Sequence, residues 1–206
     1  MLAQGSTAES GGGISCSTCT LIMQGVFIHD SVATSPELID EDKGLGGGVS
    51  CTNAGTLRLD SCVIATNLAS RGGGGLALRG CAADIATSTV NNNTVDPAAT
   101  GAVQGSAAST EYVLGGGGMF VSHNVADRTA SRFVNVFQVT MAVNRARMGA
   151  GLYMISDEDS TVCAATPYLC AQDISTRSLV RLDAIWLGQG LTANSAPGFA
   201  DKAHDV

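Results

Sequence analysis

The stretch from Leu57 to Leu76, LRLDSCVIATNLASRGGGGL, decides the fold of this chain. It contains a short segment of alternating polar and apolar residues, a second apolar segment, an Asn-x-Ala sequence, and a glycine run that opens a third apolar segment. Short alternating segments predict β-strands, and asparagine and glycine predict sharp turns between them. Other stretches of the chain repeat this plan. The sequence therefore predicts a stack of similar coils.

Glycine runs mark the repeat. Five of them each precede an apolar segment, at a spacing that varies between 27 and 43 residues. Repeats of about 20–50 residues are typical of solenoids and propellers, and the irregular spacing indicates a coil of fixed size that carries loops of variable length. Because equivalent strands of successive coils pair in parallel, equivalent residues form columns. The expected inward column after the glycine runs is Ile14, Val49, Leu76, Met119 and Leu152.

A second repeated position lies before each glycine run, where an apolar-x-x-Asn pattern predicts a corner. Residues 56–69 align without gaps with residues 20–33, 82–95 and 133–146. The expected corner residues are Ser31, Asn67, Asn93 and Asn144, followed by Asn194 near the end of the chain. Asparagine suits a corner because it bonds to backbone groups or tolerates a left-handed conformation. No glycine run follows Asn194, so we expect a single β-helix domain over residues 1–206 that is a fragment of a longer solenoid.

Composition supports an all-β class and excludes some partners. The chain has 26 glycines, 14% charged residues and a net charge of −7. Much glycine without the collagen triplet favours turns and close backbone approaches. The negative charge argues against nucleic acid as a partner, and no apolar run approaches the roughly 20 residues of a membrane span.

The coil resembles the repeats of the polymorphic outer-membrane protein family, which pair a glycine-glycine-x-apolar element with an aromatic-x-x-Asn element. The matching residues are the glycine runs and the apolar-x-x-Asn corners, and they cover nearly the whole chain outside three loops. Ile, Val or Met replaces the aromatic residue here. The resemblance implies a right-handed parallel β-helix of about five coils at the cell surface, with a role in adhesion.

Three loops are predicted to interrupt the coils, at residues 34–43, 97–114 and 156–177. The last loop contains Cys163 and Cys170, for which we predict a disulfide, since seven cysteines suit an oxidising compartment. Asp157, Glu158 and Asp159 are the candidates for calcium, but they lack the spaced aspartates of a calcium loop. A solvated acidic loop is therefore favoured, with no metal or cofactor.

Two further pairs of cysteines are notable. Cys16 and Cys51 occupy the same column of neighbouring coils, and their parallel side chains favour a buried ladder of thiols over a bridge between them. Cys16 and Cys19 form a Cys-x-x-Cys sequence, but no second pair stands at the spacing of a zinc site.

Residues that alternate with the inward column are expected to face solvent; they are Ser15, Ser50, Ala77, Phe120 and Tyr153. Phe120 and Tyr153 are the candidate ligand-binding residues, because exposed aromatic pairs anchor partners. The alternative is that one of the loops covers them. This column offers no pair of carboxylates, which a glycosidase needs.

We therefore expect a non-catalytic, extracellular, structural or adhesive segment that binds glycans or proteins or builds a surface assembly by self-association. The alternative is a carbohydrate-active enzyme similar to the pectate lyases, which are also parallel β-helices. Two exposed acids within about 10 Å in one groove would favour the enzyme.

Overall fold

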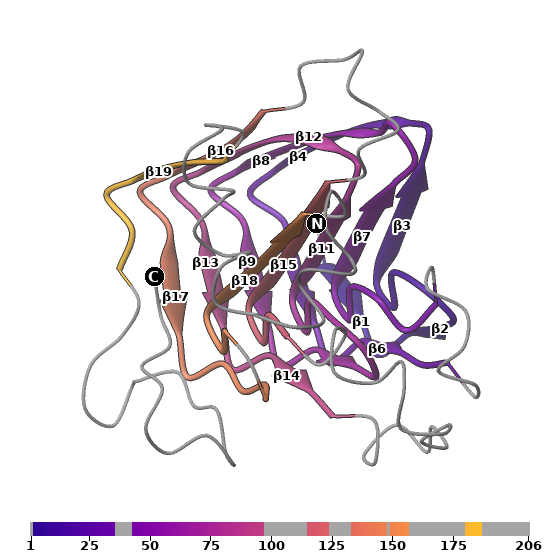
Figure 1. The fold of residues 1–206 in the computed structure, drawn as a ribbon. Coiled ribbons are helices and arrows are strands. Elements are labelled where there is room, and N and C mark those ends of the chain that lie inside the picture. Colours follow the sequence, from indigo (N-terminus) through magenta and orange to yellow (C-terminus); the bar gives the residue numbers. More distant parts are fainter. Residues whose placement is uncertain are drawn as a thin grey trace.

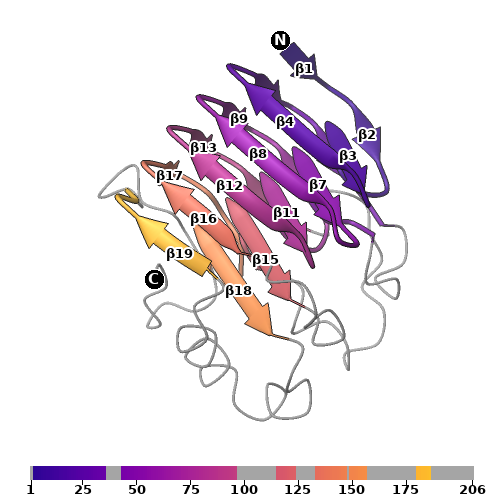
Figure 2. The ribbon, with the colours of Figure 1, turned by 90° about the horizontal axis from the view of Figure 1, so that it is seen from above.

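The structure is a computed structural model that describes residues 2–35, 43–96, 115–123, 133–147, 149–156 and 180–186. In these residues the chain winds through four parallel β-sheets, here called A, B, C and D, and each turn visits them in the order C, D, A, B. Viewed along the stack, the sheets form the walls of each coil (Figure 1). Viewed from the side, the strands of each sheet lie next to one another in successive coils (Figure 2). The predicted right-handed parallel β-helix is confirmed.

Two of the four walls of each coil, sheets A and B, are built from short strands. Sheet A contains β1 (Leu2–Gln4), β5 (Phe27–His29), β9 (Val63–Ala65), β13 (Thr89–Asn91) and β17 (Thr140–Ala142). Sheet B contains β2 (Thr7–Ala8), β6 (Val32–Ala33), β10 (Leu68–Ala69) and β14 (Thr94–Val95).

Longer strands form the other two walls. Sheet C contains β3 (Ile14–Ser17), β7 (Val49–Thr52), β11 (Leu76–Arg79), β15 (Met119–His123) and β18 (Leu152–Ser156). Sheet D contains β4 (Thr20–Gln24), β8 (Thr56–Asp60), β12 (Ala82–Ala86), β16 (Val134–Phe137) and β19 (Val180–Asp183).

The register of sheet C places one residue from each coil in the inward column. Each member pairs with the next across a parallel ladder, in the order Ile14, Val49, Leu76, Met119 and Leu152. The three middle members are fully buried. This column, with Ile28, Ile64, Val90 and Met141 from sheet A and the leucines of sheet D, forms the main core.

Left-handed residues make the corners of the coil. They lie after sheet C at Thr18, Asn53, Ala54 and Gly80, between D and A at Gly25, Ser61, Thr87, Gln138 and Ala184, between A and B at Gly5, Asp30, Thr66, Asn92 and Val143, and before sheet C at Gly11, Gly44, Gly46, Gly73, Gly116 and Gly149. A residue in the left-handed conformation changes the direction of the chain sharply, so each corner needs few residues. At the A–B corner the left-handed residue is the one before the asparagine.

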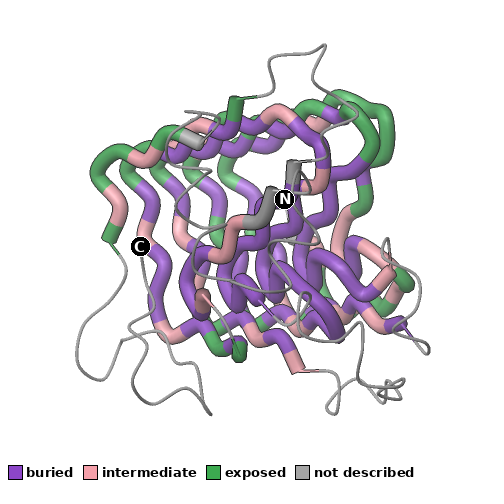
Figure 3. The backbone as a smooth tube through the Cα atoms, viewed as in Figure 1, coloured by how far each residue is buried: buried purple, intermediate pink, exposed green. Residues whose placement is uncertain are grey.

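The outward positions of sheet C differ from the prediction. Ser15 is exposed, as expected, but Ser50, Ala77 and Phe120 are buried and Tyr153 is half-buried. Their side chains still point away from the main core, and a separate cluster of Leu45, Ala77 and Phe120 packs there, with Tyr153 against it. The expectation that this column faces solvent was wrong because a second layer of chain covers it. Figure 3 shows the resulting contrast between this mostly buried wall and sheet D, which carries exposed residues.

Several predictions concern residues outside the described part of the chain. They include the Cys163–Cys170 disulfide, the acidic residues Asp157, Glu158 and Asp159, the corner Asn194 and most of the loops 34–43, 97–114 and 156–177. These stay predictions. Among the described residues no helix is long and apolar enough to cross a membrane.

Candidate functional site

The covered face of sheet C holds the aromatic pair that the sequence singled out. The rings of Phe120 and Tyr153 are stacked, with centroids 6.1 Å apart. Phe120 is only 3% exposed, and its ring lies against Gly72, the residue that starts a glycine run. Gly72 in turn pairs with Leu45 and with Gly115, so a narrow strip of chain crosses this face in successive coils. The pair therefore packs the outside of sheet C and is a poor candidate for ligand binding.

The open faces of the described structure are those of sheets D and A. Six large apolar side chains are exposed by 36–67%, and all lie on or next to these two sheets: Ile22, Phe27, Val63, Phe133, Phe137 and Trp186. Exposed aromatic residues on a rigid face are typical anchors for a partner. Sequence reasoning missed them because it followed the strands after the glycine runs. The signal was present in the alternation of Phe133, Asn135 and Phe137.

Polar side chains on sheet D form an ordered network around Asp60. Its carboxylate accepts hydrogen bonds from Thr87 Oγ1 at 2.6 Å, Ser61 Oγ at 3.1 Å and Gln24 Nε2 at 3.2 Å. These donors, with Thr87 the strongest, hold the pKa of Asp60 below its ordinary value. One row away, Asp84 accepts a hydrogen bond from Asn135 Nδ2 at 2.8 Å.

The positions of Asp60 and Asp84 bear on the enzyme alternative. Both point outward from neighbouring strands of one sheet. A glycosidase pairs an ionised carboxylate with a carboxylic acid whose pKa is raised so that it can protonate the leaving group. The hydroxyl donors push the pKa of Asp60 in the opposite direction. Asp60 is therefore unsuited to the general-acid role, and the pair gives the enzyme alternative no support.

A smaller group of polar residues lies at the A–B corner of the first coil. His29 Nδ1 is 2.7 Å from Asp30 Oδ2, and the imidazole ring stacks on Phe27 with centroids 4.4 Å apart. The contact with His29, and a second one with Thr66, lower the pKa of Asp30. His29 is thus a half-buried histidine held in place by its neighbours.

The predicted corner asparagines form a buried ladder. Asn67 N donates to Asn93 Oδ1 at 3.0 Å, and Asn93 N donates to Asn144 Oδ1 at 3.0 Å. Each Nδ2 also donates to a carbonyl of the preceding coil, those of Ile28, Ile64 and Val90. The first coil has Ser31 at this place, and its backbone N–H donates to Asn67 Oδ1 at 3.1 Å. The role of these residues is structural, because each amide satisfies buried backbone groups.

The ladder keeps its geometry although the chain between its members varies in length. Asn67 and Asn93 are 26 residues apart, whereas Asn93 and Asn144 are 51 apart, yet the bonds are equivalent. The additional residues therefore leave the register intact. Beside the ladder, Asn92 is exposed at its left-handed corner.

The cysteines differ from the predicted ladder of thiols. Cys16 forms a disulfide with Cys19, with Cα atoms 5.5 Å apart. Cys16 and Cys51 do share a register, but Cys16 is not a thiol. The prediction failed because the left-handed residue Thr18 turns the chain between sheets C and D, which brings Cys19 back toward Cys16. Cys51, Cys62 and Cys81 are buried thiols.

No group of metal-ligating residues is found in the portion of the chain that the structure describes. Cys16 and Cys19, the Cys-x-x-Cys sequence, are joined by their disulfide.

These features define a class of protein: a parallel β-helix with one covered wall, two open walls and internal asparagine and disulfide links. Comparison of the chain with protein-family models, curated proteins and solved structures finds no match. The chain's class therefore rests on its own geometry.

Proposed function

We propose that this chain is a non-catalytic structural and adhesive segment of an extracellular or surface protein, similar in role to the repeats of the polymorphic outer-membrane proteins. The observation that carries the proposal is that the large exposed apolar side chains of the described residues all lie on or next to sheets D and A. Exposed apolar side chains concentrated on particular faces mark sites of contact with a partner. The faces of a parallel solenoid are long and stiff, and such proteins use them as extended binding surfaces.

The part of this surface richest in aromatic residues lies on the last two described coils. Phe133 directly precedes β16 in sheet D and Phe137 ends it, and they are 49% and 44% exposed. Trp186 is 45% exposed and pairs with Thr140 of sheet A, around the corner from Phe137. Rings at this exposure combine a large apolar area with little side-chain entropy, which suits the contact with a glycan or a protein.

The charge of the chain limits the partner further. The net charge of −7 disfavours an anionic partner such as nucleic acid. A neutral or basic glycan or protein surface fits the open faces better.

The test is a binding experiment with the full chain on two arrays, one of glycans and one of extracellular-matrix proteins. The triple variant Phe133→Ser, Phe137→Ser, Trp186→Ser is compared with the control Ser15→Ala, Ser17→Ala, which changes exposed positions of sheet C. We expect the wild type and the control to bind on one array and the triple variant to lose at least about tenfold in affinity, as expected for the loss of several anchors. No binding by the wild type on either array would refute the proposal, as would equal binding by the triple variant.

A further inference from the structure

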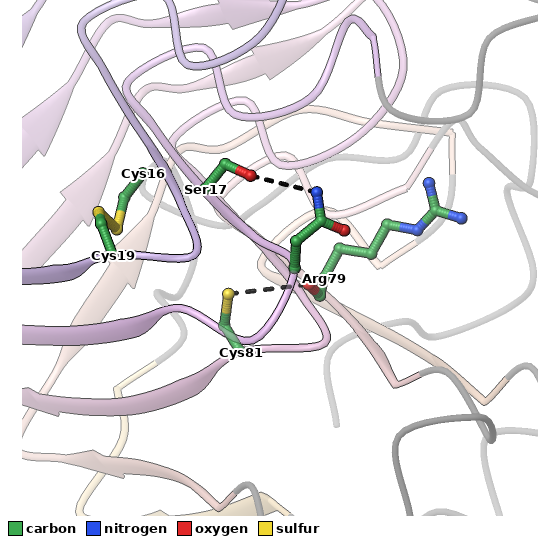
Figure 4. The surroundings of a disulfide bond; sticks show 6 residues. Cys16, Ser17, Cys19, Arg79 and Cys81 are labelled. Carbon is green, nitrogen blue, oxygen red and sulfur yellow. Dashed lines mark hydrogen bonds between the residues drawn. A yellow bond between two sulfur atoms is a disulfide. The ribbon is translucent and has the colours of Figure 1, made fainter.

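Four cysteines lie together at the corner between sheets C and D of the first three coils. In the column of Cys16 the next two coils carry Cys51 and Leu78. In the column of Cys19 they carry Gly55 and Cys81, as shown by the backbone bonds from Thr56 N to Cys19 O and from Ala82 N to Gly55 O. The first coil fills both positions with cysteine and closes them as a disulfide (Figure 4). The second and third coils each have one cysteine at these two positions.

Gly55 brings the two remaining sulfur atoms together. A Cβ atom placed on Gly55 would lie 2.7 Å from Cys51 Sγ and 3.3 Å from Cys81 Sγ. The two sulfur atoms therefore border the position that a side chain would take here and lie at most about 6 Å apart. Both residues are fully buried. Figure 4 shows Cys81 two coils below the Cys16–Cys19 disulfide. Its Sγ is 3.7 Å from the carbonyl oxygen of Arg79.

We infer that Cys51 and Cys81 are the site of a second disulfide, which links the second coil to the third when the chain folds under the oxidising conditions that maintain Cys16–Cys19. This linkage is distinct from binding at the open faces. The Cys16–Cys19 bridge closes a turn within one coil, whereas a Cys51–Cys81 bridge would join neighbouring coils.

The chemistry is ordinary thiol–disulfide exchange with a small external disulfide such as oxidised glutathione. The thiolate of one cysteine attacks the external disulfide, forms a mixed disulfide and releases one glutathione thiolate. The thiolate of the other cysteine then attacks the protein sulfur of the mixed disulfide and releases the second glutathione thiolate. The two cysteines lose two protons and two electrons in total, and one oxidised glutathione becomes two reduced molecules. Because both positions are buried in the native state, exchange takes place while the chain folds.

The third buried thiol provides a control. Cys62 lies at the corner between sheets D and A, where its Sγ is 3.4 Å from the carbonyl oxygen of Asp60 and 3.6 Å from that of Met23. It belongs to a different corner of the coil from Cys51 and Cys81. We expect it to stay a thiol.

The experiment is to refold the reduced full chain in a buffer of reduced and oxidised glutathione, block the remaining thiols after denaturation, and map the disulfides by mass spectrometry of tryptic peptides. Trypsin separates the relevant cysteines, because Cys51 lies in peptide 44–58, Cys62 in 59–71 and Cys81 in 80–128, whereas Cys16 and Cys19 share 1–43. We expect peptide 44–58 linked to 80–128 and peptide 59–71 blocked as a thiol.

Two variants sharpen the result. Cys62→Ser should leave the link unchanged, and Cys81→Ser should leave Cys51 blocked as a thiol. The inference is overturned if the wild type yields Cys51 and Cys81 both blocked as thiols. It is equally overturned if either is found linked to peptide 1–43 or to Cys62 in place of its proposed partner.

Discussion

The outward faces of sheets C and D follow the same alternation, but one is covered and the other is open. On sheet C, Ala77 and Phe120 are buried under the strip of chain that leads into the glycine runs. On sheet D, Ile22 and Phe137 are exposed. Alternation along a strand decides which side chains face the core. It does not decide whether the other side meets water, which depends on where the connecting chain passes.

We call sheet C with its glycine runs and the adjacent asparagine ladder the covered side, and sheets D and A the open side.

The largest expected contrast between the two sides is between two glycines. Gly74 belongs to a glycine run on the covered side, and a Cβ there would lie 2.5–2.6 Å from backbone atoms of Gly117 and Thr94. Gly25 lies at the D–A corner of the open side and has nothing within 4 Å of such an atom, although its φ of +60° disfavours a side chain.

We expect Gly74→Ala to lower the free energy of unfolding by roughly 4–5 kcal/mol, because the backbone itself must move. Gly25→Ala should cost only about 1–2 kcal/mol, the cost of a left-handed residue with a side chain. Urea unfolding of both variants measures the difference. Equal losses would show that the glycine run is not closely packed.

The second contrast is between two phenylalanines. Phe120→Ala removes a buried ring on the covered side and leaves a cavity, so we expect a loss of about 3–4 kcal/mol. Phe137→Ala truncates a half-exposed ring on the open side and should cost less than about 1 kcal/mol. Thermal unfolding followed by circular dichroism would rank the two. If Phe137→Ala were the more damaging change, the assignment of covered and open sides would be wrong.

A third contrast concerns two asparagines only two positions apart. Asn93 Oδ1 accepts hydrogen bonds from Asn67 N and Nδ2, and all of these groups are buried. Asn93→Ala leaves the Asn67 backbone N–H without this acceptor and removes one of the two hydrogen bonds of Asn67 Nδ2, so we expect a loss of roughly 2–3 kcal/mol. Asn91 is half-buried in sheet A and its Oδ1 makes no hydrogen bond, so Asn91→Ala breaks no comparable bond and should change stability by less than about 0.5 kcal/mol. The unfolding midpoints of the two variants give the comparison, and similar values would contradict the structural role of the ladder.

The smallest effect concerns the pH dependence of the open side. The hydrogen bonds from Thr87 and Ser61 lower the pKa of Asp60 in the folded state. A lowered pKa stabilises the folded protein above the ordinary value of 3.8, and this contribution is lost as the pH falls through the folded value.

Thr87→Ala removes the strongest donor and should raise the pKa of Asp60 toward that ordinary value. Titration of the side-chain carboxyl carbon by nuclear magnetic resonance, in the wild type and the variant, measures the change. A wild-type Asp60 that titrates at or above the ordinary value would contradict the network.

The sequence was sufficient for the coil because the coil is a local and repeated pattern. The glycine runs and the corner asparagines identify equivalent positions in each coil, and parallel pairing then fixes columns such as that of Ile14, Val49 and Leu76. The equivalence of Asn67 and Asn93, which are 26 positions apart, could be recognised without any knowledge of the loops.

The sequence was insufficient where the outcome depends on contacts between distant parts of the chain. The burial of Phe120 depends on Gly72 and Leu45 passing outside its own sheet, which no pattern of alternation reveals. The Cys16–Cys19 disulfide depends on the left-handed conformation of Thr18, a residue type that rarely adopts it. The open faces were overlooked because their apolar residues lie outside the strands that follow the glycine runs.

The corners of the coil also differ in length, and this has a consequence for how the chain accommodates change. Two residues connect sheet D to sheet A in the described coils, as between Asp60 and Val63, and two connect A to B, as between Ala65 and Leu68. By contrast, residues 97–114 fall between sheets B and C, and residues 157–179 fall between C and D. Foreign peptides grafted at these positions between sheets B and C or between C and D would leave the stacked columns undisturbed. A single residue added between D and A or between A and B would shift every later strand by one position. The chain thus accepts inserted segments at two of its corners and keeps a constant length at the other two, which makes it a natural scaffold for displaying inserted sequences.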